Sequence, residues 1–244
     1  SPDGTQVLTG SDDRTAKLWD TATGEEIRTL SVYYEVHAVA FSPDGTQVLT
    51  GAHDDHIADL WHASTGAAIR TFSGHWIGVT CVAFSPDGTQ VLTGSLDRTA
   101  KLWDTSTAAE LRTFSGHFSN VLSVAFSPDG TQVLTGSIDN FARLWDAATG
   151  TEIRTFSGHG GDVYSVAFSP DGTQVLTGGQ NDTAKLWNAA TGAEIRTFSG
   201  HADDVLSVAF SPDGTQVLTG SDDNCTRVSA ATTGSGIITV KGKG

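Results

Sequence analysis

The 244-residue sequence predicts an all-β fold made of six similar four-stranded antiparallel sheets. The stretch Ser-Pro-Asp-Gly-Thr-Gln-Val-Leu-Thr-Gly occurs six times without a change, and its copies begin 41 to 43 residues apart. Short β-rich runs separated by turn residues fill each interval, and no segment keeps a helical apolar period. Sheets this small must stack to bury their faces, so we expect a β-propeller of six blades around a central channel. The copies begin at residues 1, 42, 85, 127, 169 and 211.

Residues 117–158 form the clearest unit. A β-rich run ends at Ser127-Pro-Asp-Gly, where proline at the second and glycine at the fourth position favour a type I turn that closes a hairpin. All six prolines of the chain stand in this turn, so none interrupts a strand. The links are short, which suits antiparallel neighbours, because a parallel crossover needs a dozen residues or more. The expected strands are 121–126, 131–135, 141–145 and 152–156, with a turn over 136–140.

The repeat runs from end to end, which predicts one domain over residues 1–244. The sequence begins at a first turn and stops after a fourth strand, so the first blade is expected to lack its innermost strand. A further segment of a longer array, a neighbouring chain or a distorted strand would fill the gap, and the sequence leaves these alternatives open. The units are 1–31, 32–74, 75–116, 117–158, 159–200 and 201–244.

Composition argues against several partners. The chain has 14 Lys and Arg against 28 Asp and Glu, and its net charge of −14 repels phosphate backbones and anionic lipid. No apolar run approaches the roughly 20 residues needed to span a bilayer. We therefore expect neither nucleic acid nor a membrane as partner. The two cysteines, Cys81 and Cys225, fall at different places in the repeat and form no disulfide or metal pattern, which favours a cytoplasmic location.

The repeated motifs resemble those of the WD40-repeat family over essentially the whole chain. Ser-Pro-Asp-Gly recurs in every unit, Gly-His occurs at 74–75, 116–117, 158–159 and 200–201, and Leu-Trp-Asp at 18–20, 102–104 and 144–146. The resemblance implies a propeller that acts as a protein-interaction platform and not as an enzyme, although fold alone does not establish function.

The resemblance also implies a structural hydrogen-bond network in each blade. It joins a tryptophan on the third strand, a hydroxyl on the second, the Gly-His histidine and the aspartate of the second turn. We interpret such sets as structural and not as catalytic triads, because a nucleophile has no reason to be copied into every blade. The networks map onto His75, Thr93 or Ser95, Asp97 and Trp103, and onto His117, Thr135 or Ser137, Asp139 and Trp145.

The second unit departs furthest from the pattern, because Tyr33-Tyr34-Glu35 replaces the Gly-His stretch. A dense His/Asp group follows, but its spacing matches no known ligand motif, so we interpret it as a solvated turn and expect no metal site and no cofactor. The group comprises His53, Asp54, Asp55, His56, Asp59 and His62.

The loops divide between two rims. The rim of Ser-Pro-Asp-Gly and Thr-Gly turns is nearly uniform, whereas the rim of Gly-His loops and Gly-Ser-x-Asp turns varies. On the variable rim we expect one aromatic and one acidic arc, which would bind a protein or peptide segment that carries an apolar and a basic residue. The alternative is that the aromatic side chains pack over the blade ends. The predicted partner-binding residues are Tyr33, Tyr34, Trp76, Phe118, Asp162, Asp203 and Asp204.

Two other functions compete with this one. A lectin-like or other small-ligand-binding propeller would need the same polar and aromatic set in every groove, whereas the candidate contact positions differ between units. An enzyme that used the central channel would need paired carboxylates, metal ligands or a nucleophile with its base at one place, and we find no such set in the sequence. We therefore predict a non-enzymatic interaction scaffold.

Overall fold

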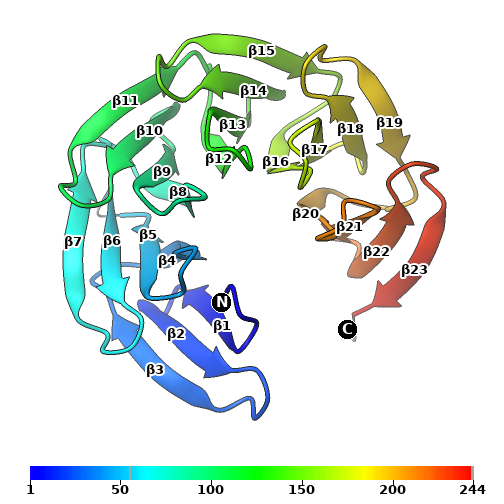
Figure 1. Cartoon of the computed structure of the whole chain (residues 1–244). Coiled ribbons are helices and arrows are strands. Elements are labelled where there is room, and N and C mark those ends of the chain that lie inside the picture. Colours follow the sequence, from blue (N-terminus) through cyan, green and yellow to red (C-terminus); the bar gives the residue numbers. More distant parts are fainter. Residues whose placement is uncertain (55, 243–244) are drawn as a thin grey trace. The chain divides into compact units, whose positions relative to one another are not determined.

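The computed structural model describes residues 1–54 and 56–242. These residues form strands and turns, and no helix occurs among them. The strands make six antiparallel sheets in chain order, the first three-stranded and the other five four-stranded (Figure 1). The all-β fold of six blades, with an innermost strand missing from the first, is therefore confirmed. The chain divides into two structural units, Ser1–Gly116 and His117–Gly244, and each holds three consecutive blades.

The first unit contains blades 1 to 3. Within it, the innermost strands of neighbouring blades lie against each other (Figure 1). Blade 1 consists of β1 (Gln6–Ser11), β2 (Thr15–Asp20) and β3 (Glu26–Ser31); blade 2 of β4 (Val36–Phe41), β5 (Gln47–Ala52), β6 (Ile57–His62) and β7 (Ala68–Ser73); blade 3 of β8 (Val79–Phe84), β9 (Gln90–Ser95), β10 (Thr99–Asp104) and β11 (Glu110–Ser115).

The second unit contains blades 4 to 6 in the same arrangement. Blade 4 consists of β12 (Val121–Phe126), β13 (Gln132–Ser137), β14 (Phe141–Asp146) and β15 (Glu152–Ser157); blade 5 of β16 (Val163–Phe168), β17 (Gln174–Gly179), β18 (Ala184–Asn188) and β19 (Glu194–Phe198); blade 6 of β20 (Val205–Phe210), β21 (Gln216–Ser221), β22 (Cys225–Ala230) and β23 (Gly236–Lys241).

The Ser-Pro-Asp-Gly turn is held by its own side chains. In blade 4 the amide of Gly130 donates to the Ser127 carbonyl at 2.9 Å, and Gly130 has a φ of 71°. The Asp129 carboxylate accepts the Ser127 hydroxyl at 2.6 Å and the Thr131 amide at 3.0 Å. Aspartate is thus needed to close the turn from both sides, which accounts for its presence in every copy.

The second strand is longer than the sequence predicts. In blade 4 it runs through Gly136 to Ser137, so the turn expected over 136–140 begins later. A Cβ atom on Gly136 would lie 2.8 Å from Cγ1 of Val166 on the next blade. The glycine therefore belongs to the strand, and it lets the neighbouring inner strand approach closely.

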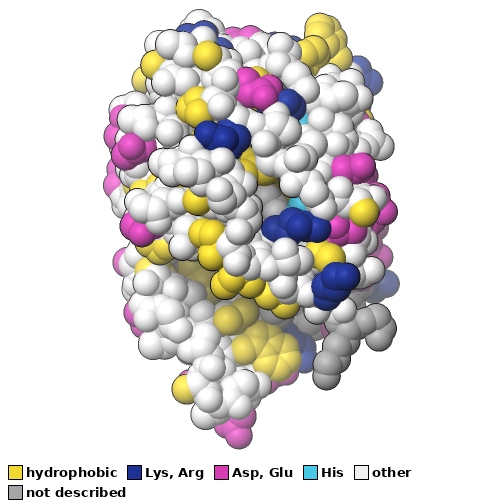
Figure 2. All heavy atoms as spheres, turned by 90° about the vertical axis from the view of Figure 1, so that its right-hand side faces the viewer, with side chains coloured by type: hydrophobic (Ala, Val, Ile, Leu, Met, Phe, Trp, Pro, Cys, Tyr) yellow, Lys and Arg dark blue, Asp and Glu magenta, His cyan; other side chains and the backbone are white. Residues whose placement is uncertain are grey.

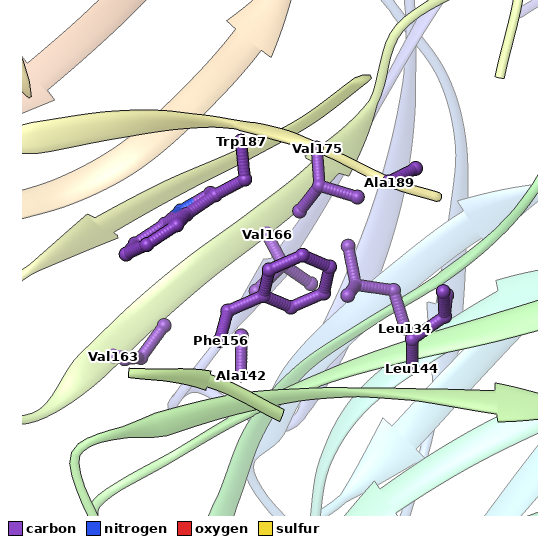
Figure 3. Packing of buried hydrophobic residues seen from close by; sticks show 9 residues of the cluster. All are labelled: Leu134, Ala142, Leu144, Phe156, Val163, Val166, Val175, Trp187 and Ala189. Atoms are coloured by element: carbon purple, nitrogen blue, oxygen red, sulfur yellow. The ribbon is translucent and has the colours of Figure 1, made fainter. Parts of the chain in front are cut away.

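The core lies between neighbouring sheets. Between blades 4 and 5, the ring of Phe156 from β15 lies 5.8 Å from that of Trp187 from β18, at 51° (Figure 3). Valines of the inner strands, Ala142 of β14 and Ala189 of the turn after β18 fill the space around them. The cluster comprises Leu134, Ala142, Leu144, Phe156, Val163, Val166, Val175, Trp187 and Ala189.

Not all apolar side chains are buried. Figure 2 shows hydrophobic side chains open to solvent among acidic and basic ones. On β23 of blade 6, Ile237, Ile238 and Val240 are about half exposed.

Candidate interaction surface

A hydrogen-bond chain crosses blade 3 from its third strand to its first loop. Trp103 Nε1 donates to Thr93 Oγ1 at 2.9 Å, and Thr93 Oγ1 lies 2.7 Å from His75 Nε2. On the other side of the ring, His75 Nδ1 lies 2.8 Å from Asp97 Oδ2. In the tautomer with hydrogen on Nδ1, His75 donates to the aspartate, and the Thr93 hydroxyl accepts from Trp103 and donates to Nε2. The hydroxyl in the chain is that of Thr93, because Ser95 donates instead to the Ile77 carbonyl.

Blade 4 repeats this arrangement through Trp145, Thr135, His117 and Asp139, with Ser137 bonded to the Ser119 carbonyl. In blade 5, Asn181 replaces the aspartate beside His159 at 2.8 Å. Blade 6 keeps His201, Thr219 and Asp223, and it carries Ser229 in place of the tryptophan. Blade 1 keeps the tryptophan and threonine as Trp19 with Thr9, and its turn aspartate Asp13 accepts the Thr15 amide and hydroxyl. Blade 2 keeps Trp61 with Thr50.

The electrostatics of the networks oppose nucleophilic chemistry. Hydrogen bonds from His75 and Thr99 outweigh the cost of burying Asp97 and lower the pKa of its carboxyl to about 2. All donors and acceptors of the set are engaged with one another, so the arrangement rigidifies the blade.

Burial raises the pKa of the Cys81 thiol to about 12, so this cysteine is not a poised nucleophile either.

The loops divide between two edges of each blade as the sequence predicts. In blade 3 the amide of Leu96 donates to the Gly78 carbonyl, which joins the second turn to the Gly-His loop. At the opposite edge, the amide of Thr105 donates to the Thr89 carbonyl and joins the Ser-Pro-Asp-Gly turn to the turn between the outer strands.

The predicted aromatic residues of the first unit are open to solvent. Tyr33 and Tyr34 lie between β3 and β4, with ring centroids 6.5 Å apart, and Tyr33 is 88% exposed. Trp76 lies between β7 and β8 and is 65% exposed.

In the second unit, Phe118 is also largely exposed, at 77%, and its ring lies 6.0 Å from the Arg143 guanidinium. The arginine is held in turn by Glu152 at 2.6 Å. Phe118 therefore rests on a charged side chain and not on the apolar core.

The predicted acidic residues lie close together in the second unit. Asp203 and Asp204 have carboxylate oxygens within 4.8 Å of each other and of Asp182, a neighbour that the sequence reasoning missed. Burial and the charge of Asp204 raise the pKa of Asp162. The Tyr164 hydroxyl donates to Asp204 at 3.2 Å. Burial of Tyr164 raises the pKa of this hydroxyl to about 12. Asp182 follows Asn181 at a position where blades 3, 4 and 6 carry Arg98, Asn140 and Asn224, and this difference is a signal that the sequence does contain.

Comparison with known proteins agrees with this geometry. A model of the WD domain, G-beta repeat, matches residues 1–20, 24–62, 66–104, 108–146, 150–188 and 192–228. The chain belongs to the WD40-repeat family. WD40 repeats are typical of protein-interaction scaffolds.

Among curated proteins, "Dynein assembly factor with WD repeat domains 1" from Homo sapiens and from Macaca fascicularis each match this WD40 chain with 55% identity over 40 residues. The match covers 16% of this chain and 10% of either relative. It is about one repeat long. In the part of the chain that the structure describes, no helix has the length and apolar character needed to cross a membrane.

Grooves between WD40 blades open at the uniform rim. One of about 750 Å³ lies between blades 2 and 3, and one of about 470 Å³ between blades 4 and 5. Equivalent residues line both, such as Asp44 and Asp129 from the Ser-Pro-Asp-Gly turns. No aromatic side chain lines either groove among the described residues.

The His/Asp group of blade 2 is only partly brought together. His53 Nδ1 lies 2.9 Å from Asp54, and Asp59 accepts the Thr71 hydroxyl at 2.6 Å. His56 and His62 do not join a set of three metal-ligating residues in the described part of the chain. Asp55 lies outside the described residues.

Proposed function

We propose that the chain is a non-enzymatic module that binds a protein or peptide segment through the rim of Gly-His loops and Gly-Ser-x-Asp turns. Its family is typical of such scaffolds. The observation that carries the proposal is the exposure of Trp76. The five other tryptophans lie on the third strands, and each bonds through its indole N–H to a threonine or packs in the core. An indole held in solvent is free to anchor a partner.

The rim suits a partner with two kinds of side chain. Tyr33, Tyr34 and Trp76 in the first unit, and Phe118 in the second, offer aromatic faces to an apolar side chain. Asp162, Asp203 and Asp204 in the second unit offer carboxylates to lysine or arginine. The short repeat-length match to dynein assembly factors supports the repeat type, and it does not identify the partner. The two free cysteines agree with a cytoplasmic location.

The test is a random-peptide display against the full chain. We expect the selected peptides to share an apolar residue near a basic one, and we expect Trp76→Ala and the double variant Asp203→Asn, Asp204→Asn to weaken binding by tenfold or more. Ile195→Ala, which removes an exposed apolar side chain from β19, serves as the control. Selected peptides that bind all variants equally would exclude this rim.

A second function has one observation in its favour. The grooves at the uniform rim repeat with equivalent linings, as expected of a small-ligand-binding propeller with one site per blade pair. Screening with small carbohydrates distinguishes the two functions, because ligands of these grooves would be insensitive to Trp76→Ala and sensitive to Asp44→Asn.

A further inference from the structure

Three metal-ligating side chains converge where blade 1 meets blade 2. His37 Nε2 lies 3.5 Å from Glu35 Oε2 and 3.9 Å from Asp12 Oδ1. All three ligand atoms lie within 4.8 Å of one another. Asp12 follows β1 on blade 1, whereas on blade 2 Glu35 precedes β4 and His37 is its second residue. The three side chains therefore come from two blades, and Asp12 is too far from Glu35 and His37 in the sequence for a spacing motif to reveal the set.

Local backbone structure aims His37 at this place. Val36 pairs with Ala52 and Ala38 pairs with Gly51, so His37 is the extra residue of a β-bulge. Bulges redirect side chains at strand ends. The same bulge position on β16 holds Tyr164, whose hydroxyl reaches Asp204 on the next blade.

A second imidazole holds the His37 ring. The His53 ring is stacked on it, with centroids 4.7 Å apart and 27° between the planes. His53 is itself fixed through Nδ1 by Asp54 at 2.9 Å. The stacking therefore fixes the plane of the His37 ring through a neighbour that is itself anchored.

The two distances from His37 are near those around a tetrahedral ion. With Zn–N and Zn–O bonds of about 2.0–2.2 Å, two ligands at the tetrahedral angle lie about 3.4 Å apart. The separation of His37 and Glu35 is close to this value, and that of His37 and Asp12 is about 0.5 Å longer. Asp12 has a largely exposed side chain on a turn, so a small rotation closes the difference.

Other blades provide an internal comparison. In each blade pair, three places correspond to Asp12, Glu35 and His37. They are the residue after the second strand of one blade, and the residues before and within the bulge of the next blade. Among the described blade pairs within each unit, only blades 1 and 2 carry a metal-ligating side chain at all three places. The corresponding trios are His53, Gly78 and Thr80; Ile138, Asp162 and Tyr164; and Gln180, Asp204 and Leu206.

We propose that Asp12, Glu35 and His37 form a Zn²⁺ site that links blade 1 to blade 2, with water as the fourth ligand and His53 as the residue that orients His37. Two carboxylates balance the charge of the ion, and the imidazole nitrogen selects Zn²⁺ over Mg²⁺ and Ca²⁺, which prefer oxygen ligands. The proposal is independent of the function proposed above.

The experiment titrates Zn²⁺ into the metal-free full chain by calorimetry and follows thermal unfolding. We expect one ion per chain, and a rise in Tm of about 5 °C or more at a free concentration 100 times Kd. Bound Co²⁺ should show the visible absorption of four-coordinate cobalt.

The variants take residues that other blades carry at the same places, so that folding is preserved. His37→Thr, Glu35→Asn and Asp12→Leu should each weaken Zn²⁺ binding by tenfold or more, and His62→Ala on β6 should leave it unchanged. Absence of Zn²⁺ binding by the wild-type chain, or binding that survives His37→Thr with the same affinity, would overturn the proposal.

Discussion

Arg28 on β3 lies across Gly66 of the following blade. Its guanidinium donates to the carbonyls of Ser64 at 2.6 Å and Thr65 at 3.0 Å, and its Cδ is 2.9 Å from the point that a Cβ atom on Gly66 would occupy. Gly66 has a φ of 71°, so the glycine provides both the left-handed turn and the space for the arginine. The same contact joins Arg154 to the turn at Gly192 and Arg196 to the turn at Gly234.

Blade 3 lacks this contact. Its turn has Ala108, with a φ of 60°, in place of the glycine. Among the described residues, Arg70 makes no hydrogen bond to that turn and lines the 750 Å³ groove instead. A methyl group in the path of the arginine explains the difference.

We predict that Ala108→Gly stabilises the protein and that Gly66→Ala destabilises it. The first removes a left-handed alanine and frees the path of Arg70, which should raise Tm by about 2–4 °C, or about 1 kcal/mol. The second adds backbone strain and displaces Arg28, at a cost of about 1–3 kcal/mol. Urea and thermal unfolding measure both changes.

Gly24→Ala is the matched control. Gly24 has a φ of 72°, and no atom of the described residues lies within 4 Å of the point that an added Cβ atom would occupy. It therefore reports backbone strain alone, and the excess loss in Gly66→Ala measures the arginine contact. Equal losses in the two variants would show that the contact contributes nothing.

Removing the central hydroxyl of a network should be costly where the network is buried. Thr93→Val leaves Trp103 Nε1 and His75 Nε2 without a partner in the core of blade 3. We expect the free energy of unfolding to fall by about 2–4 kcal/mol, measured in urea.

Thr9→Val provides the comparison. Thr9 is exposed, and it accepts only the Trp19 N–H, which water can satisfy after the change. The expected loss is below about 1 kcal/mol. If the two variants lose the same free energy of unfolding, burial does not determine how much the network stabilises a blade.

The repeat period and its turn residues are sufficient to predict the fold. Proline and glycine in Ser-Pro-Asp-Gly fix where strands end, and their spacing fixes four strands per unit. The sequence left Thr93 and Ser95 open as the network hydroxyl, because both are on the same strand. Only the position of each side chain relative to the His75 ring decides between them.

Contacts between blades could not be predicted in the same way. Arg28 reaches a carbonyl 36 residues away, and Asp12 meets His37 through a bulge that shifts the register of β4. Both contacts join residues of two different repeats, so a pattern within one repeat does not reveal them. Whether Tyr33, Trp76 and Phe118 form one binding surface stays a prediction.

Acid should weaken blade 5 more than blade 3. Burial lowers the pKa of His159 below its ordinary value of 6.5, and the neutral Asn181 supplies no charge to offset it. The unfolded chain thus binds a proton more readily than the folded chain, so stability is lost as pH falls below about 6.5. In blade 3, the lowered pKa of Asp97 gives stability that is lost only as pH falls from 3.8 toward about 2.

Asn181→Asp tests this explanation. It places a carboxylate beside His159, as in blades 3 and 4, and should reduce the loss of stability between pH 7.5 and pH 5. Hydrogen exchange of β17 and β18 at the two pH values measures the effect locally. Equal acid sensitivity in the wild type and the variant would contradict it.

Trp76 and Phe118 distinguish a binding rim from packing over the blade ends. Because both side chains are mostly in solvent, their replacement by alanine should change the free energy of unfolding by about 0.5 kcal/mol or less. Phe72→Ala, which empties a fully buried position in the core of blades 2 and 3, should cost about 3–5 kcal/mol. Small losses at Trp76 and Phe118 together with lost peptide binding would assign these side chains to recognition. Losses near that of Phe72→Ala would mean that they hold the blades together, and the proposed rim would lose its anchors.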